Sequence, residues 1–360
     1  MDSEDSMEGL RPPRGPRPSG STGPFRGPLP HFALLLSRRL RGWGGVSAMA
    51  AACVLTASLT LLPLSRQVDE DVESSAKSAQ RTATAVPATA AAECENPQAS
   101  LRPSTADGPA IERIRQKGKL TVGVDQNSYR WGYRNSATGE LEGFDIDLAR
   151  AIAEDILGDP DAIIFRAIPT NLRIPALQNG TVDLVVRTMT INCDRIQQVA
   201  FSTAYFQAGQ QVLAPIGSPV TGHNNSLTGK RVCTASGSTA YEELEKRSYG
   251  AVFKDNTVPN QLDCLVRLQL GEVDAVVTDN ALAAGQAAQD PGVELKGKPF
   301  TEEYYGIAAK LGNDDLIRRV NQVLVGYRAG GANSPWMTSY SKWLRTDLGP
   351  TAGPPAPLYK

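Results

Sequence analysis

From residue 111 to residue 344 the chain alternates short apolar runs with longer amphipathic stretches, and this alternation restricts the possible folds most. Runs such as 120–124 and 273–277 are typical of buried strands, because they are short and rich in valine. The stretches between them carry apolar residues at helical spacing. Strands that alternate with helices indicate parallel α/β sheets covered by helices. With 360 residues, the chain can form two such domains.

The predicted elements fall into two sets. In the first, strands are expected at 120–124, 162–166 and 182–186, and helices at 111–117, 145–157 and 173–179. In the second, strands are expected at 230–233 and 273–277, and helices at 240–246 and 261–270. Residues 305–309 return to the first set, and helices at 316–327 and 336–344 follow. We therefore expect a discontinuous domain, 110–213 plus 303–348, and an inserted domain, 214–302, with a hinge and a ligand cleft between them.

A short internal echo supports two similar units. The heptapeptide LQNGTVD at 177–183 recurs as LQLGEVD at 268–274, each with a helix end, a glycine and the start of a strand. The alternative is ordinary helix-to-strand turn chemistry, because glycine commonly ends helices.

The helix predicted at 145–157 begins with the sequence GFDIDL, residues 143–148. Asp145 and Asp147 lie in its first turn, where the helix dipole favours negative charge. On local physics alone this is only a well-started amphipathic helix. The sequence, however, matches every position of the signature of family 3 extracellular solute-binding proteins, and the chain resembles that family from about residue 111 to 348. The resemblance implies an α/β, periplasmic-binding-protein-like fold that binds amino acids outside the membrane, usually for an ABC importer.

A free amino acid presents an α-carboxylate, which the planar guanidinium of arginine binds well. In the family, a hydroxyl residue five positions before an arginine forms the carboxylate clamp, and Thr190 and Arg195 occupy those positions. Thr188 lies in the same segment. Ser238 and Thr239 lie in a turn before a predicted helix, where backbone N–H groups can point at an anion.

Other family positions are expected to hold the rest of the ligand. The resemblance implies that Asp279 accepts the α-ammonium, although it could instead cap a helix. Asp125 is expected to bind the ammonium or the side chain, or only to cap a turn. The segment 170–178 resembles glutamate- and aspartate-binding members, so Arg173, with Arg187, is expected to meet an acidic side chain; a solvent-facing Arg173 is the alternative.

We therefore expect a protein that captures glutamate, or a relative such as glutamine, aspartate or asparagine, for the permease of an ABC transporter. The alternative is a membrane-anchored amino-acid sensor coupled to a signalling membrane protein. An enzyme is not expected, because the two histidines, His31 and His223, have no acid–base or ligand-spaced partners. No cofactor or metal is expected. A net charge of −1 argues against nucleic acid as a partner.

The N-terminal third predicts attachment to the cell membrane. Residues 46–64 are uncharged and just long enough to span a bilayer of about 30 Å. The basic flank at 38–41 predicts a transmembrane signal anchor, with 1–45 as a disordered, basic, proline-rich cytoplasmic tail and the binding head outside. A cleaved signal and a lipoprotein at Cys53 are the alternatives. Residues 65–109 read as an extracytoplasmic linker and 349–360 as a tail.

Four of the five cysteines are candidates for disulfides in an extracytoplasmic protein. Cys233 ends a predicted strand and Cys264 lies in a helix of the same domain, so packing could bring their Cα atoms within about 4.4–6.8 Å. Cys94 and Cys193 remain as a second possible pair, which would pin the linker to the head. Buried free thiols are the alternative.

Overall fold

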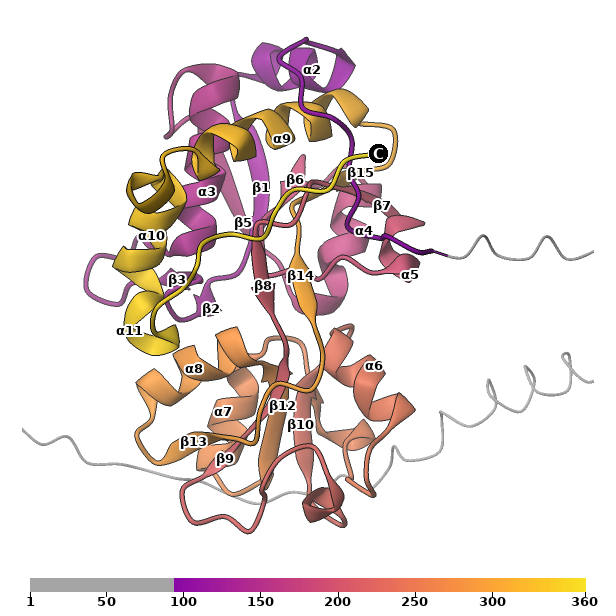
Figure 1. Ribbon diagram of the computed structural model, residues 1–360, viewed down its shortest axis with the longest axis vertical. Helices are drawn as coiled ribbons and strands as arrows, with labels where there is room; N and C mark the ends of the chain where they lie inside the picture. The colour runs from indigo at the N-terminus through magenta and orange to yellow at the C-terminus, as the bar shows by residue number, and fades with distance from the viewer. Residues whose placement is uncertain (1–93) are drawn as a thin grey trace, which may run out of the picture. The chain divides into compact units, whose positions relative to one another are not determined.

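The computed structural model describes residues 94–360, which form two α/β lobes joined by two crossing strands (Figure 1). The first lobe contains a five-stranded sheet in the order β5-β1-β6-β15-β7. Its strands are β1 (Leu120–Val124), β5 (Ile163–Ala167), β6 (Leu184–Val185), β7 (Val199–Phe201) and β15 (Ala308–Lys310). Its helices are α2 (Pro109–Lys117), α3 (Phe144–Leu157), α4 (Arg173–Gln178), α5 (Cys193–Ile196), α9 (Asp314–Arg328), α10 (Pro335–Trp343) and α11 (Arg345–Leu348).

The second lobe repeats this arrangement with a sheet in the order β11-β10-β12-β9-β13. Its strands are β9 (Gln210–Pro215), β10 (Val232–Ala235), β11 (Thr257–Val258), β12 (Ala275–Asp279) and β13 (Val293–Lys296). Its helices are α6 (Thr239–Lys246), α7 (Leu262–Gln269) and α8 (Asn280–Gln289). The predicted fold class, two α/β domains, is therefore confirmed.

Each sheet is covered on both faces, which explains why a central strand such as β1 is buried along its whole length. All five residues of β1 are buried. On one face Val122 packs in a cluster with Ile146 and Leu148 of α3, and on the other Val185 packs with Leu177 of α4. Burial of such side chains stabilises the fold by roughly 1.5–3 kcal/mol each. The signature helix α3 thus contributes its apolar face to the main core of the first lobe.

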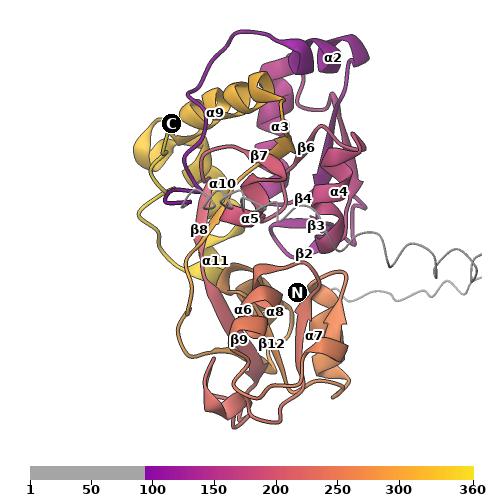
Figure 2. The same ribbon diagram turned by 90° about the vertical axis from the view of Figure 1, so that its right-hand side faces the viewer.

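The crossing strands β8 (Phe206–Ala208) and β14 (Glu303–Tyr305) pair antiparallel to each other between the lobes (Figures 1 and 2). The next strand, β9, pairs with β12 and β13 and so belongs to the second lobe. The structure therefore puts the first junction at about Gly209, whereas the boundary expected at 213/214 cuts through β9. Apolar strands before and after a crossing look alike in sequence, and only the pairing separates them.

Three features of the fold differ from the prediction. The sheets are mixed, because β15 runs antiparallel to β6 and β9 runs antiparallel to β12. Between β1 and α3, where no strand was predicted, the chain forms a small sheet of β2 (Asn127–Ser128), β3 (Gly132–Arg134) and β4 (Leu141–Glu142). Helix α8 was not predicted, because its alanine-rich sequence lacks a clear apolar stripe.

Both ends of the described chain pack on the first lobe. Ser100 donates its N–H to Leu358 O at 3.0 Å and accepts the N–H of Lys360 at 2.8 Å. Its hydroxyl also donates to Phe201 O at 2.6 Å. The linker and the C-terminal tail were therefore predicted too long: 94–109 and the last residues are part of the head.

The predicted segments 1–45 and 46–64 and most of the linker, 65–93, lie outside the described residues. Within 94–360, no helix combines the length and the apolar character that crossing a membrane requires.

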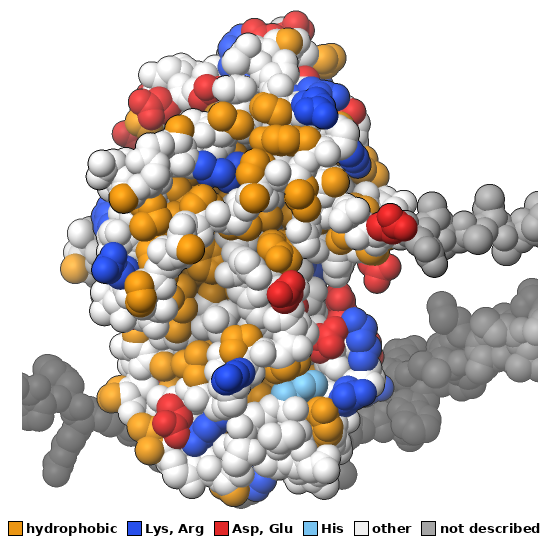
Figure 3. Space-filling model, viewed as in Figure 1, with side chains coloured by type: hydrophobic (Ala, Val, Ile, Leu, Met, Phe, Trp, Pro, Cys, Tyr) orange, Lys and Arg blue, Asp and Glu red, His pale blue; other side chains and the backbone are white. Residues whose placement is uncertain are grey.

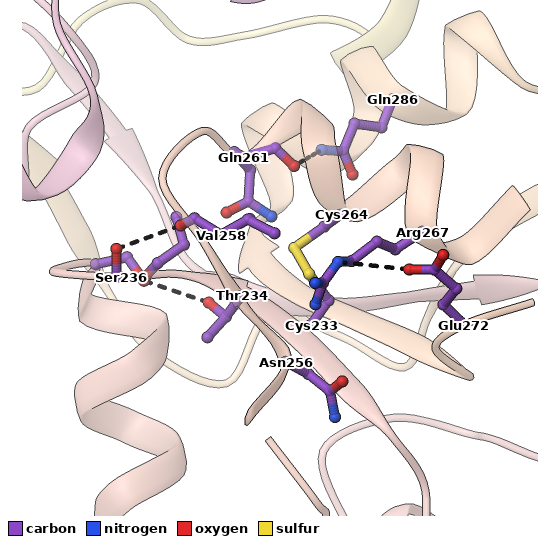
Figure 4. Close-up of a disulfide and its surroundings, with 12 residues drawn as sticks. Cys233, Thr234, Ser236, Asn256, Val258, Gln261, Cys264, Arg267, Glu272 and Gln286 are labelled. Carbon is purple, nitrogen blue, oxygen red and sulfur yellow. Dashed lines mark hydrogen bonds and ion pairs between the residues drawn. A yellow bond between two sulfur atoms is a disulfide. The ribbon is translucent and has the colours of Figure 1, made fainter. Parts of the chain in front are cut away.

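Two disulfides are present among the described residues. Cys233 of β10 is bonded to Cys264 of α7, with Cα atoms 5.5 Å apart, as the sequence predicted (Figure 4). Cys94 is bonded to Cys193 at the start of α5, with Cα atoms 5.8 Å apart, which was the second possible pair. The first bridge fastens α7 to its sheet, and the second fastens the N-terminal segment to the first lobe.

Replacing Cys233 and Cys264 together by serine should lower the free energy of unfolding by about 3–4 kcal/mol, because the bridge closes a loop of 31 residues. Urea unfolding of exported protein under non-reducing conditions measures the loss. The double serine variant of Cys94 and Cys193 serves as the comparison, since its bridge lies in the other lobe. Peptide mapping that found Cys233 as a free thiol in the unmodified protein would contradict the pairing.

Candidate functional site

A small cavity lies where the two lobes meet. All nine residues predicted as ligand-binding line it: Asp125, Arg173, Arg187, Thr188, Thr190, Arg195, Ser238, Thr239 and Asp279. Both lobes contribute, as expected for a cleft.

The lobes are in direct contact around the cavity. Thr170 donates its N–H to Pro259 O across the cleft at 3.0 Å, and Trp131 Nε1 donates to Ala281 O at 3.2 Å. Gly237 of the second lobe lies so close to Asn171 that a Cβ atom added to Gly237 would be 2.9 Å from the Cα of Asn171. Gly237 also has φ +73°, a conformation that glycine adopts without strain. The structure therefore shows the cleft closed.

Three buried arginines face this cavity from the first lobe. Arg187 forms an ion pair with Asp125 at 2.9 Å, and both side chains are buried. Arg195 follows Asn192, whose side chain caps α5, and lies 3.6 Å from Glu242 of the second lobe. Arg195 also donates to Thr190 O at 2.9 Å and to Gly237 O at 3.2 Å. The predicted pair Thr190 and Arg195 is thus adjacent in space.

Arg173 differs from the other two because no carboxylate within 94–360 forms an ion pair with it. It is 4% exposed and donates to the carbonyl oxygens of Thr170 at 2.9 Å and Gly237 at 3.3 Å. Burial lowers the pKa of Arg173 well below its usual range, and the nearby charges of Arg195 and Arg187 lower it further. The alternative of a solvent-facing Arg173 is wrong. Among residues 94–360 its charge is therefore balanced only by carbonyl oxygens.

Asp279 supplies negative charge on the opposite side of the cavity. Its carboxylate accepts from Tyr305 Oη at 2.5 Å and from Gln210 Nε2. Burial raises the pKa of Asp279 to about 7, and the nearby carboxylate of Glu303 contributes in the same direction. Asp279 is the N-cap residue of α8 by position, but its side chain makes no capping hydrogen bond to the helix.

Asp125 and Ser238 combine a local role with a place in the cavity wall. Asp125 caps its turn, because Oδ1 accepts from Gln126 N at 2.8 Å and Asn127 N at 3.0 Å, while Oδ2 meets Arg187. Ser238 is the N-cap of α6 and accepts from Tyr241 N at 3.1 Å. The capping role of both residues is therefore observed, while their role toward a ligand stays a prediction.

Three further polar residues at the site were missed by the sequence analysis. Gln210 and Gln261 line the cavity, and Glu303 accepts from Thr239 Oγ1 at 3.1 Å beside it. Within 94–360 the buried Nε2 of Gln261 has no hydrogen-bond partner, while its backbone oxygen accepts from Gln286 Nε2 at 3.0 Å (Figure 4). A glutamine within an apolar strand, as at 210, was the available signal.

Among residues 94–360 no group of His, Cys, Asp and Glu has the arrangement of a metal site. His223, the pale blue side chain in Figure 3, lies outside the cavity, where it stacks on Phe300 with ring centroids 3.9 Å apart. On the face shown in Figure 3, basic and acidic side chains are interspersed, as the near-zero net charge implies.

The raised pKa of Asp279 has a consequence for stability without ligand. Because the folded-state pKa, about 7, exceeds the usual 3.8, the folded state binds more protons than the unfolded chain between these values. The stability that protonated Asp279 contributes is present at low pH and is lost as the pH rises from about 4 to 7. Wild type should therefore lose stability relative to Asp279→Asn over this range. Parallel pH slopes of the two proteins in urea unfolding would contradict the assignment.

Known proteins resemble this chain in sequence and in structure. Residues 120–346 match the profile of bacterial extracellular solute-binding proteins, family 3. The ABC transporter glutamine-binding protein of Bacillus subtilis is 37% identical over 237 residues, 66% of this chain and 85% of the relative. A glutamate-binding protein of Corynebacterium efficiens is 28% identical over 65% of this chain and 80% of its own. An ancestral arginine-binding protein solved with glutamine superposes with a TM-score of 0.57 and 36% identity, over 65% of this chain and 99% of its own.

Proposed function

This chain belongs to the bacterial extracellular solute-binding proteins of family 3, a family of binding proteins and not of enzymes, and we propose that it captures a free amino acid for an ABC importer. The observation that carries the proposal is the pairing of charges in one closed cavity. Arg195 with Thr190 would hold the α-carboxylate, and Asp279 would accept the α-ammonium. Thr188, Ser238 and Thr239 would complete the carboxylate side.

For the side chain of the ligand we propose a five-carbon amino acid, glutamate or glutamine. Relatives named for glutamine and for glutamate support this range. Arg173 favours glutamate, because among residues 94–360 its buried charge meets only carbonyl oxygens, and an acidic side chain would neutralise it. Arg187 is already paired with Asp125 and would bind the side chain only as a secondary partner.

Calorimetry of the purified head, residues 94–360, with each of the twenty amino acids tests the proposal. Binding of glutamate or glutamine, with no binding of lysine or arginine, is the expected result. Failure to bind any free amino acid would defeat it. Copurification from membranes then separates the two possible partners: an ABC permease is expected, whereas a signalling membrane protein would favour the sensor.

We also propose that residues 46–64 anchor the protein with the head outside the membrane. The support is the uncharged run of 19 residues, preceded by Arg38, Arg39 and Arg41. Cys53 lies inside this run, whereas the acylated cysteine of a lipoprotein should end it.

Cys53→Ser should accordingly leave the protein in the membrane fraction, because a single spanning helix does not depend on one acyl chain. The intact mass of the membrane-extracted chain checks the anchor directly. A mass corresponding to a chain that begins at an acylated Cys53 would show a lipoprotein instead.

A further inference from the structure

One buried carboxylate contacts both the wall of the cavity and the hinge, although it does not line the cavity. Asp145, the second residue of α3, is 1% exposed. Its Oδ2 accepts the backbone N–H of Thr188 at 3.1 Å, and its Oδ1 accepts the hydroxyl of Tyr205 at 2.8 Å. Thr188 lines the cavity, and Tyr205 directly precedes the crossing strand β8.

Thr188 adopts a conformation that needs support from its surroundings. Its φ is +39°, which is unfavourable for a β-branched residue. Such a conformation persists where neighbouring contacts hold it, and these positions cluster at functional sites. The bond from the Thr188 N–H to Asp145 is one such contact, and the bond from Gly306 N to Met189 O, at 3.0 Å, is another. The turn that carries Thr188 into the cavity is therefore held from behind.

Tyr205 connects the same carboxylate to the hinge. It is fully buried, and its N–H donates at 2.8 Å to the carbonyl oxygen of Tyr305, the last residue of the other crossing strand. Tyr305 in turn donates its hydroxyl to Asp279 at 2.5 Å. Each lobe thus has a buried aspartate that accepts the hydroxyl of a tyrosine: Tyr205, which precedes β8, and Tyr305, which ends β14. Burial raises the pKa of Asp145 to about 7, while the bonds from Tyr205 and Thr188 lower it and so favour the ionised form.

We propose that Asp145 is a positioning residue of the binding site, which holds Thr188 in its left-handed conformation and fixes that turn to Tyr205 at the start of β8. The inference deepens the proposed function and rests on it where ligand affinity is the measurement. The neighbouring carboxylate of the signature offers a matched control. Asp147 Oδ2 accepts from Ser339 Oγ at 2.8 Å and Trp343 Nε1 at 2.7 Å, so it joins α3 to α10 and reaches neither the cavity nor the hinge.

The test is a double-mutant cycle measured by calorimetry with L-glutamine and L-glutamate. Asp145→Ala should weaken binding roughly ten-fold or more, because it removes a charged acceptor from Thr188. Asp147→Ala should bind as wild type does. In a Thr188→Gly background the loss should shrink, since glycine adopts a positive φ without strain. Wild-type affinity in Asp145→Ala, or the same loss in both backgrounds, would overturn the proposal.

A second measurement does not depend on ligand. Hydrogen exchange of the Thr188 amide in the free protein should be faster in Asp145→Ala than in wild type or Asp147→Ala. If Asp145→Ala does not fold, Asp145→Asn replaces it, because the amide keeps only one acceptor oxygen and should give a smaller change in the same direction. Unchanged exchange at Thr188 would defeat the inference even if Asp145→Ala bound the amino acids more weakly than wild type. A wild type that binds no amino acid would defeat only the proposed function.

Discussion

Arg195→Ala should abolish measurable binding of the amino acid while the protein stays folded. The guanidinium of Arg195 is 5% exposed, and it is the predicted partner of the ligand's α-carboxylate. Loss of one partner of a buried charge-assisted pair costs about 2–5 kcal/mol, or roughly 30- to 4,000-fold in Kd. Folding should survive, because within the protein Arg195 bonds mainly to carbonyl oxygens and its nearest carboxylate, Glu242, is partly exposed.

Calorimetry and far-UV circular dichroism of the same sample separate binding from folding. Arg267→Ala is the control, because Arg267 lies on α7, partly exposed and 3.6 Å from Glu272. It should bind with wild-type affinity. Near-normal affinity in Arg195→Ala would mean that another group holds the α-carboxylate.

Arg173→Met should reduce affinity for glutamate by about 2–5 kcal/mol, because the charge that meets an acidic side chain is lost. Affinity for glutamine should fall by only about 1 kcal/mol, the size of a neutral hydrogen bond. The same change should leave the free protein at least as stable as before, because a buried charge with no carboxylate partner among residues 94–360 is replaced by an apolar chain.

The neighbouring Arg187 supplies the comparison for this stability effect. Arg187→Met breaks a buried ion pair and leaves Asp125 without its partner, so it should destabilise the free protein by about 3–5 kcal/mol. Urea unfolding of both variants without ligand therefore should give effects of opposite sign. Equal losses of glutamate and glutamine in Arg173→Met would show that Arg173 does not read the side chain.

Periodicity alone was sufficient to predict the best-defined elements. The strand at 120–124 has the predicted bounds, and α3 begins only one residue earlier than predicted. Both were accessible because their signals are local: an apolar run for the strand that is buried on both faces of its sheet, and a glycine at each end of α3. Helix α8 and strand β9 gave no such signal. An alanine-rich helix has little amphipathic pattern, and the lobe to which a strand belongs depends on pairing with distant residues.

The residues of the cavity likewise fall into those that local sequence signals predict and those that they do not. Residues such as Asp125, Arg195 and Asp279 could be predicted as its lining because they follow strands or match family positions, although their roles toward a ligand stay predictions. Glu303 and Gln210 could not be found in this way. Their place depends on how β14 and β9 leave the hinge, which no local pattern records. The conformation of Thr188 likewise arises from the packing around it.

Both ends of the described head are fastened to one lobe, through the bond between Cys94 and Cys193 and the pairing of Ser100 with Tyr359. The second lobe is joined to it covalently only through the two crossing segments. A fluorescent protein fused at either end of this head would therefore move with the first lobe, and its signal would change little when the cleft closes. A sensor of amino-acid uptake built on this chain needs its second fluorophore inside the inserted lobe, for example in the exposed loop around Gly217.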